Sequence, residues 1–437
     1  MWWRWREAWA TLLGHQPLVY LLQGRVISQI GQNALLYTLL LVTVDRTGSS
    51  FFTALMVVSL TSPSIVLGLP GGALADVIPP RWSLVGGAVA RVAIGALMVA
   101  NAQDLPTLYL LAFLFAAVGQ VVGPAESAVL PLLVENTFLA RANALFVLVT
   151  VLGQLGGGVI LAPFLFKLLG PRAVMVVVAL LYVWLAMVLL RIGTMPTREP
   201  SQGEGLDTWE AMLLGWRILT DNRAAYMAMV LMTATMLLLK TVVVLAPHYV
   251  KETLNIEAEN VVFVMVPAAL GAGLAILSTP LMGRFIGVGR AATVAFVILL
   301  AGLVALGLVV QLRDFILAHL DLGISFIESR LGVSSVITLT VLLAVPVGLM
   351  GTMVLVATRT ILHQEAPLHS QARVFATQSA IADGLSLIPT LALGSIADLA
   401  GARWVLLGTT LLMAFAVVYA LQRGQEVVGR LRRWAVQ

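Results

Sequence analysis

The sequence predicts an all-α membrane protein with twelve transmembrane helices in two pseudo-symmetric six-helix bundles. Two observations support this prediction. Hydrophobic residues make up 60% of the 437 residues and charged residues only 11%, whereas charged residues make up about 25% of a typical soluble domain. Apolar runs of about twenty residues recur along the whole chain, and a helix of that length crosses the hydrocarbon core of a bilayer.

The candidate spans follow from cutting the chain wherever charged and turn-forming residues interrupt the apolar runs. The expected spans are 17–44, 51–75, 83–102, 106–134, 142–166, 173–190, 224–246, 260–282, 291–311, 334–357, 374–397 and 404–421. The longest polar interval follows the sixth span. The sequence therefore predicts an N-terminal six-helix bundle at 1–190, a cytoplasmic linker with an amphipathic helix at 191–223, and a C-terminal six-helix bundle with a short cytoplasmic tail at 224–437.

Two further segments are apolar but carry several charges. Segment 207–219 has apolar residues at helical spacing beside Glu210 and Arg217, which is typical of a helix lying along the membrane interface. Segment 313–330 carries Asp314, His319, Asp321 and Glu328. Charges at this density are costly inside hydrocarbon, so we expect an outer-surface helix or a re-entrant piece rather than a thirteenth span.

The positions of Lys and Arg set the expected orientation. Placing both termini in the cytoplasm puts most of the loop Arg and Lys residues on the inner side, as membrane insertion favours. We therefore expect a multi-pass protein of the plasma (cytoplasmic) membrane with both termini cytoplasmic. The net charge of +5 is explained by this bias, and no nucleic-acid partner is expected.

A short pattern of Gly, Ala-Asp and a basic residue occurs twice, as "GGALADVIPPR" at 71–81 and "GSIADLAGAR" at 394–403. Related short links occur at 166–172 ("FKLLGPR") and 281–290 ("LMGRFIGVGR"). Each of the four lies between the second and third spans of a three-helix unit. The two halves of the chain therefore look like duplicates of each other.

Twelve spans, a division into six and six, three-helix units and the Gly, Ala-Asp, basic link together resemble the major facilitator superfamily of secondary transporters. Segments such as "SQIGQNALLYTLL", "LARANAL" and "QARVFATQSAIADGLSLIPTLALGSIAD" resemble the branch that contains enterobactin exporters, macrolide efflux proteins and lysophospholipid transporters. The resemblance implies a monomer that works by alternating access and needs no cofactor, with the proton gradient as its energy source.

Within that resemblance, we favour proton-coupled efflux, by antiport, of amphipathic organic compounds. The alternative is a flippase or facilitator for lysophospholipids. From another class, a membrane enzyme or a receptor that no longer transports remains open. The sequence has no G-x-x-x-x-G-K-[ST] phosphate loop, so the chain cannot power transport with ATP by that route. An enzyme is disfavoured because no set of catalytic groups at one depth is evident. The cluster "HQEAPLH" at 363–369 lacks the spacing of a zinc site, so no metal is expected.

The resemblance also implies a cytoplasmic gate built from the first repeated link. In the superfamily, the acid at the position of Asp76 bonds to the start of the eleventh span, which here begins near Arg373. The corresponding gating residues are Gly72, Asp76, Arg81 and Arg373. The link departs from the family pattern because one Arg and the Gly after the Asp are absent. Asp398, in the second copy, is expected to cap the turn between its own helices.

Charged and amide side chains inside the spans are functional candidates because burying them in hydrocarbon is costly. Arg25, Arg91 and Glu126 each lie about eight residues from the cytoplasmic end of a span, or roughly 12 Å, so we expect them at one depth. Gln29 and Gln32 follow Arg25 at spacings that place all three on one helical face. That face is expected to line the central cavity, although a buried Arg–Glu brace that never touches substrate is the alternative.

The second half carries Lys240 in the seventh span and Asp383 in the eleventh. Their offset along the membrane normal leaves two interpretations open, a direct pair or an Asp383 that bonds to nearby polar residues such as Ser386. Withdrawal from water favours the protonated form of a carboxylate. Glu126 or Asp383 is therefore expected to carry a coupling proton.

Overall fold

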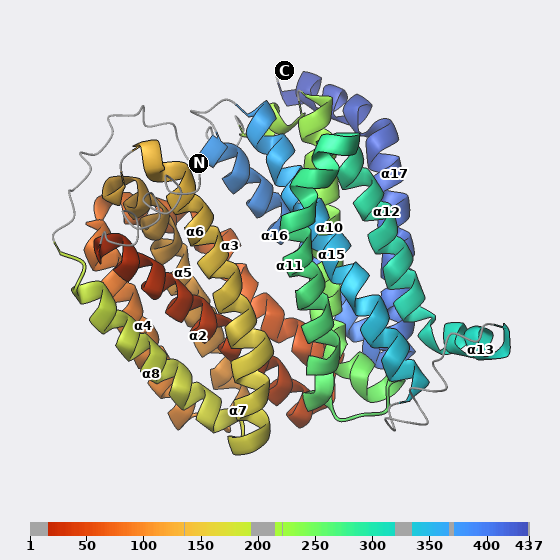
Figure 1. Ribbon diagram of the computed structural model, residues 1–437, viewed down its shortest axis with the longest axis horizontal. Coiled ribbons are helices and arrows are strands. Elements are labelled where there is room, and N and C mark those ends of the chain that lie inside the picture. Colours follow the sequence, from red (N-terminus) through yellow and green to blue (C-terminus); the bar gives the residue numbers. More distant parts are fainter. Residues whose placement is uncertain are drawn as a thin grey trace, which may run out of the picture. The chain divides into compact units, whose positions relative to one another are not determined.

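The computed structural model describes residues 16–134, 136–193, 215–220, 222–319, 334–366 and 371–435 (Figure 1). These residues form helices and turns and contain no strand. Eleven of the described helices are long and apolar enough to cross a membrane, and Val262–Ile286, bent by 52°, is the candidate for a twelfth span. The prediction of an all-helical membrane protein with about twelve spans is confirmed.

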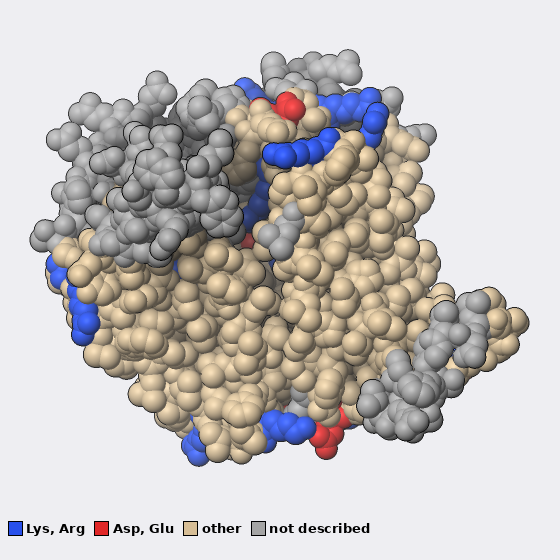
Figure 2. Space-filling view, viewed as in Figure 1, with Lys and Arg blue, Asp and Glu red and all other residues tan. Residues whose placement is uncertain are grey.

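The chain divides into two compact units. Unit 1 consists of Met1–Arg46 and Leu55–Gly205, and unit 2 of Thr47–Ala54 and Leu206–Gln437. The short segment Thr47–Ala54 therefore belongs to unit 2, although it connects two helices of unit 1. Both units expose large apolar side chains, including Ile160 and Phe164 in unit 1 and Ile388 and Phe415 in unit 2. Few charged residues interrupt the surface in view (Figure 2), as expected for helices that face lipid.

Unit 1 contains six spans. They are α2 (Gln16–Thr47), α3 (Ser50–Val77), α4 (Pro80–Ala100), α5 (Leu105–Leu133), the composite span of α6 (Asn136–Gln154), a π-helical turn (Leu155–Leu161) and α7 (Ala162–Leu169), and α8 (Pro171–Leu190). α4 packs against α5 and α8. Pro80 and Pro171 stand at the first positions of α4 and α8, where a missing N–H has no consequence and the fixed φ suits a helix.

Glycines allow the composite span to approach α2 closely. A Cβ atom at Gly153 would lie 2.7 Å from the Cβ of Gln29, and one at Gly157 would overlap the carbonyl oxygen of Ile30. Both glycines lie on or just before the π-helical turn, which shifts the register of the helix by one residue. This packing fixes the position of the α2 face that carries Gln29.

Unit 2 contains α10 (Arg223–Thr253), α11 (Val262–Ile286), α12 (Val288–Gly307), α13 (Val309–His319), α15 (Ser335–Glu365), α16 (Gln371–Ala400) and α17 (Ala402–Ala435). α15 packs against α11 and α12, and α10 contacts α15, α16 and α17. The segment 313–330 begins within the short α13, and its residues from 320 on lie outside the described part of the chain. Of the predicted interfacial helix at 207–219, only residues from 215 on are described, and these are helical.

The repeated links between spans differ in how they turn the chain. Gly170, Gly287 and Gly401 have φ of +79°, +84° and +87° and directly precede α8, α12 and α17. This left-handed conformation ends a helix at little cost only when the residue is glycine. The link before α4 instead uses Pro79 and Pro80, so the first copy of the repeat makes its turn by a different device.

Asp398 does not cap its own turn, contrary to the expectation from the sequence. Its carboxylate accepts hydrogen bonds from the Ser49 hydroxyl, from the Ser50 N–H at 2.5 Å and from the Phe51 N–H at 3.2 Å. A carboxylate near the C-terminal end of α16 meets the negative end of its own helix dipole. The free N–H groups at the start of α3, within unit 2, supply the favourable partner instead.

Candidate functional site

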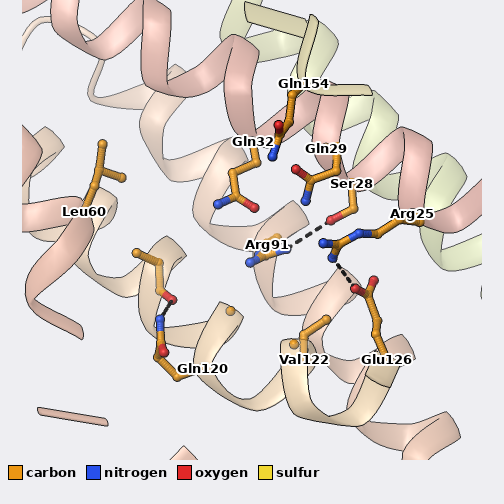
Figure 3. A pocket seen from close by; sticks show the side chains of 13 residues that line it. Arg25, Ser28, Gln29, Gln32, Leu60, Arg91, Gln120, Val122, Glu126 and Gln154 are labelled. Carbon is orange, nitrogen blue, oxygen red and sulfur yellow. Dashed lines mark hydrogen bonds and ion pairs between the residues drawn. The ribbon is translucent and has the colours of Figure 1, made fainter. Parts of the chain in front are cut away.

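A polar cavity of about 330 Å³ lies within unit 1 (Figure 3). This volume is within the range of small-molecule sites. It is lined by residues from α2, α3, α4, α5 and α6, namely Arg25, Ser28, Gln29, Gln32, Leu60, Arg91, Ala116, Gly119, Gln120, Val122, Gly123, Glu126 and Gln154. The cavity therefore gathers most of the charged and amide side chains that the spans of this unit carry in mid-helix.

An ion pair between α2 and α5 forms one wall of the cavity. The Nη1 atom of Arg25 lies 2.5 Å from the Oε2 atom of Glu126. The Nε–H of Arg25 donates to the hydroxyl of Thr150 on α6 at 2.9 Å, and the guanidinium lies 4.8 Å from the ring centroid of Phe146. Only 6% of Glu126 is exposed. Because Arg25 is held from two sides, the guanidinium is fixed in the orientation that meets the carboxylate.

Arg91 of α4 brings a second guanidinium to the same cavity. Its Nη1 atom lies 3.5 Å from the hydroxyl oxygen of Ser28, which is at the limit of a hydrogen bond. The guanidinium carbon lies 4.8 Å and 5.4 Å from the ring centroids of Phe115 and Tyr182. The Tyr182 hydroxyl in turn donates to the Ser28 carbonyl oxygen at 3.2 Å. Two aromatic rings therefore hold Arg91 at the cavity wall.

Amide side chains complete the polar lining. Gln29 and Gln32 come from α2, Gln120 from α5 and Gln154 from the end of α6. Gln32 is exposed, whereas Gln29 is only 7% exposed and packs against Gly153. Amides can both donate and accept hydrogen bonds, so this lining suits the polar part of an organic molecule.

Five of the residues singled out from the sequence meet at this cavity: Arg25, Gln29, Gln32, Arg91 and Glu126. Sequence reasoning did not single out Gln120, Gln154 or Gly119. Gln120 and Gln154 carry the same signal as Gln29, an amide within an apolar span. Gly119 carries no signal of its own, because its role depends on the position of Arg91 on another helix.

The other two predicted residues form a charge pair within unit 2. The Nζ atom of Lys240 on α10 lies 2.7 Å from the Oδ1 atom of Asp383 on α16. The same Nζ donates to the hydroxyl of Ser386 at 2.7 Å, and that hydroxyl donates to the carbonyl oxygen of Asp383 at 2.9 Å. Of the two interpretations left open by the sequence, the direct pair is present, and Ser386 bonds to Lys240 and to the backbone of Asp383.

Of the four predicted gating residues, one is described in full. Arg81 donates from Nη2 to the carbonyl oxygen of Leu190 at 3.1 Å, and its guanidinium carbon lies 5.8 Å from the ring centroid of Trp82. Gly72 and the side chains of Asp76 and Arg373 lie outside the part of the chain whose side chains are described. The cytoplasmic gate stays a prediction.

Comparison with known proteins gives a family match and a set of similar folds. The model of the family described as Major Facilitator Superfamily matches residues 21–390. No curated protein sequence matches the chain. Similar solved structures include a mutant of the nucleoside transporter NupG, with 14% identity, a TM-score of 0.70, and coverage of 93% of this chain and 99% of that one.

Two bacterial homologues of other transporters have similar structures. A homologue of the human lysosomal transporter Spinster, in an inward-facing and unoccupied conformation, has 14% identity and a TM-score of 0.66, covering 93% of this chain and 96% of that one. A homologue of the iron transporter ferroportin, in an inward-facing state, has 17% identity and a TM-score of 0.63, covering 93% of this chain and 99% of that one. At these identities the likeness shows the fold alone.

Proposed function

Because the chain belongs to the major facilitator superfamily, and is therefore a multi-pass membrane transporter rather than an enzyme, we propose that it exports amphipathic organic compounds in exchange for protons. The compound and the proton would bind within the membrane, and the protein would expose them to each side in turn by alternating access. The ion pair of Arg25 and Glu126 on the cavity wall is the observation that carries this proposal.

The ion pair supports proton coupling through its position. A charge inside the hydrocarbon region costs several kcal/mol unless it is paired or hydrated, so a carboxylate retained there needs a reason. Glu126 borders a polar cavity through which a proton can reach it, and protonation would remove its charge and release Arg25. Proton binding to Glu126 would therefore change the charge of the substrate cavity directly.

The lining of the cavity supports an amphipathic substrate. Charged and amide groups provide contacts for a polar group, while Leu60, Ala116 and Val122 provide apolar contacts in the same cavity. The distribution of Arg and Lys supports an orientation with both termini in the cytoplasm, and the membrane that we propose is the plasma membrane. We propose that the protein acts as a monomer.

Transport by the purified protein in liposomes tests the proposal. The interior is loaded with the pH-sensitive dye pyranine, a proton gradient is imposed, and a naphthalene-based amphiphile is added outside. Exchange predicts that the amphiphile accumulates on the acidic side and that this accumulation discharges the gradient. Accumulation that ignores the gradient, as expected of a lysophospholipid facilitator, would contradict proton exchange.

Matched variants identify the carboxylate that carries the proton. Glu126→Gln keeps the shape of the side chain but cannot ionise, so it should abolish accumulation while the protein still folds. Asp314→Asn is the control, because Asp314 lies on α13, with 61% of its side chain exposed, and contacts Arg313 outside the cavity. If Glu126→Gln accumulates the amphiphile as the parent protein does, Glu126 is a structural brace.

A further inference from the structure

The wall of the unit 1 cavity carries one more positive than negative group. Arg25 and Arg91 contribute two guanidinium groups, and Glu126 contributes one carboxylate. Glu126 is already the ion-pair partner of Arg25. Among the described residues, no carboxylate lies within ion-pair distance of Arg91. The described cavity wall therefore has a net positive charge, because one carboxylate stands against two guanidinium groups.

Arg91 is also short of hydrogen-bond acceptors. It is only 4% exposed, and its Nε–H has no acceptor among the described residues. Its contact with Ser28 is long at 3.5 Å, and a further contact joins it to the hydroxyl of Tyr182. The rings of Phe115 and Tyr182 stabilise the positive charge through their faces. Aromatic faces do not replace acceptors for the five N–H groups of a guanidinium. Buried polar groups are normally satisfied, so this one indicates a missing partner.

The open side of Arg91 faces the cavity. Figure 3 shows Arg91 in the middle of the lining side chains, between those of α2 and those of α5. A Cβ atom at Gly119 would lie 2.8 Å from its Nη2 atom, so the lack of a side chain at this position lets the guanidinium lie directly against α5. Because Arg91 lines the cavity, an acceptor that enters the cavity meets the guanidinium.

We propose that the cavity binds an anionic group, a carboxylate or a phosphate, of the transported compound, and that Arg91 is its charged contact. This inference rests on the proposed function and specifies the chemistry of its substrate. A guanidinium matches planar carboxylate and tetrahedral phosphate oxygens through paired N–H donors. The amide of Gln120, which lines the same cavity on α5, offers a further donor.

The charge of the cavity disfavours the binding of cationic and neutral amphiphiles. A cationic amphiphile would add a second uncompensated charge near Arg91 in a region of low dielectric constant. A neutral amphiphile would leave the N–H groups of Arg91 without a charged acceptor. An anion instead supplies both the missing charge and the missing acceptors.

Binding of matched probes to the purified protein in lipid nanodiscs tests the inference. Naphthyl phosphate, naphthoate, naphthylmethanol and naphthylmethylamine share one ring system and differ in charge. We expect calorimetry to give dissociation constants for both anions at least about tenfold lower than for the alcohol, with the amine weakest. Equal affinity for the four probes, or tightest binding of the amine, would overturn the inference.

Variants assign the preference to Arg91. Arg91→Gln should remove the preference for anions, and Arg91→Lys should keep part of it because a charge remains without the paired donors. Arg172→Gln is the control, since Arg172 donates to the Val99 carbonyl oxygen outside the cavity. Thermal unfolding of each variant identifies any that fails to fold, and Arg91→Lys then carries the test. An unchanged preference in a folded Arg91 variant would refute the assignment.

Two further comparisons complete the test. One distinguishes a lipid from a soluble anion, and the other distinguishes failure of this inference from failure of the proposed function. Short-chain lysophosphatidylglycerol binding more tightly than naphthyl phosphate would identify a lipid headgroup as the source, and the reverse would identify a soluble anion. Because binding is measured without a gradient, anion-selective binding with no transport in liposomes would overturn the proposed function alone. Proton-driven transport of amphiphiles with no anion selectivity would overturn this inference alone.

Discussion

An alanine at position 119 tests how closely Arg91 is held against the cavity. The added Cβ would lie 2.8 Å from Nη2 of Arg91, whereas such atoms in ordinary contact lie about 3.5 Å apart. The guanidinium therefore has to move by about 0.7 Å, and the rings of Phe115 and Tyr182 restrict that movement. Overpacking of a closed core costs about 1–3 kcal/mol, and the end of a long side chain that borders a cavity yields at the lower end of that range. If about 1 kcal/mol is lost from anion binding, the dissociation constant of naphthyl phosphate rises roughly fivefold.

Gly123→Ala is the matched control for Gly119→Ala. Gly123 lines the same cavity one turn further along α5, and a Cβ atom there would meet nothing within 4 Å. Both substitutions gain the same helix propensity, so any difference between them reflects the contact with Arg91. Calorimetry gives the two affinities, and thermal unfolding confirms that both variants fold. If Gly119→Ala binds naphthyl phosphate as tightly as Gly123→Ala does, Arg91 is not held where the contact places it.

Three further predictions concern other residues of the two units. Glu126→Gln should bind naphthyl phosphate more tightly than the parent protein, because it removes the only carboxylate among the described cavity residues; weaker binding in calorimetry would contradict this. In this cysteine-free chain, Gln32→Cys should react with a water-soluble thiol reagent much faster than Leu35→Cys, since Leu35 is buried; equal rates would refute the assignment of the α2 face. Asp383→Asn should lower the stability by about 1–3 kcal/mol, because Lys240 keeps its charge without its counterion; an unchanged melting temperature would show that the pair contributes little.

The sequence predicts which residues reach the cavity better than it predicts how they pair. Mid-span charges and amides stand out because hydrocarbon penalises them, and the rise of a helix gives their depth. Depth does not give the direction in which a side chain points from a neighbouring helix. That Glu126 bonds to Arg25 while Arg91 lies between aromatic rings depends on how α4 and α5 are rotated about their axes. This rotation follows from packing along the whole length of the helices.

The length of a side chain explains why the pairing of Lys240 with Asp383 was left open. The offset between Lys240 and Asp383 along the membrane left a direct pair in doubt, yet their atoms lie 2.7 Å apart. An extended lysine side chain reaches over about one helical turn, so an offset of that size does not prevent a pair. The contact of Asp398 with the start of α3 was not predicted for a different reason. Its partners are more than 340 positions away in the chain, and local sequence spacing does not reveal such contacts.

The charge balance of the cavity places a condition on proton exchange. With Glu126 ionised, two guanidinium groups and one carboxylate give a formal charge of +1, and protonation raises it to +2. A proton and an anion therefore strengthen each other's binding. Exchange then requires that the protein does not change between its inward-open and outward-open states while both are bound. Exchange of a monovalent anion for a proton moves two charges per cycle, whereas cotransport moves none. Since a membrane potential contributes about 2.3 kcal/mol per charge per 100 mV, we expect accumulation in liposomes to respond steeply to a potassium diffusion potential set with valinomycin. Accumulation that does not change with this potential would indicate cotransport of a proton and an anion instead of exchange.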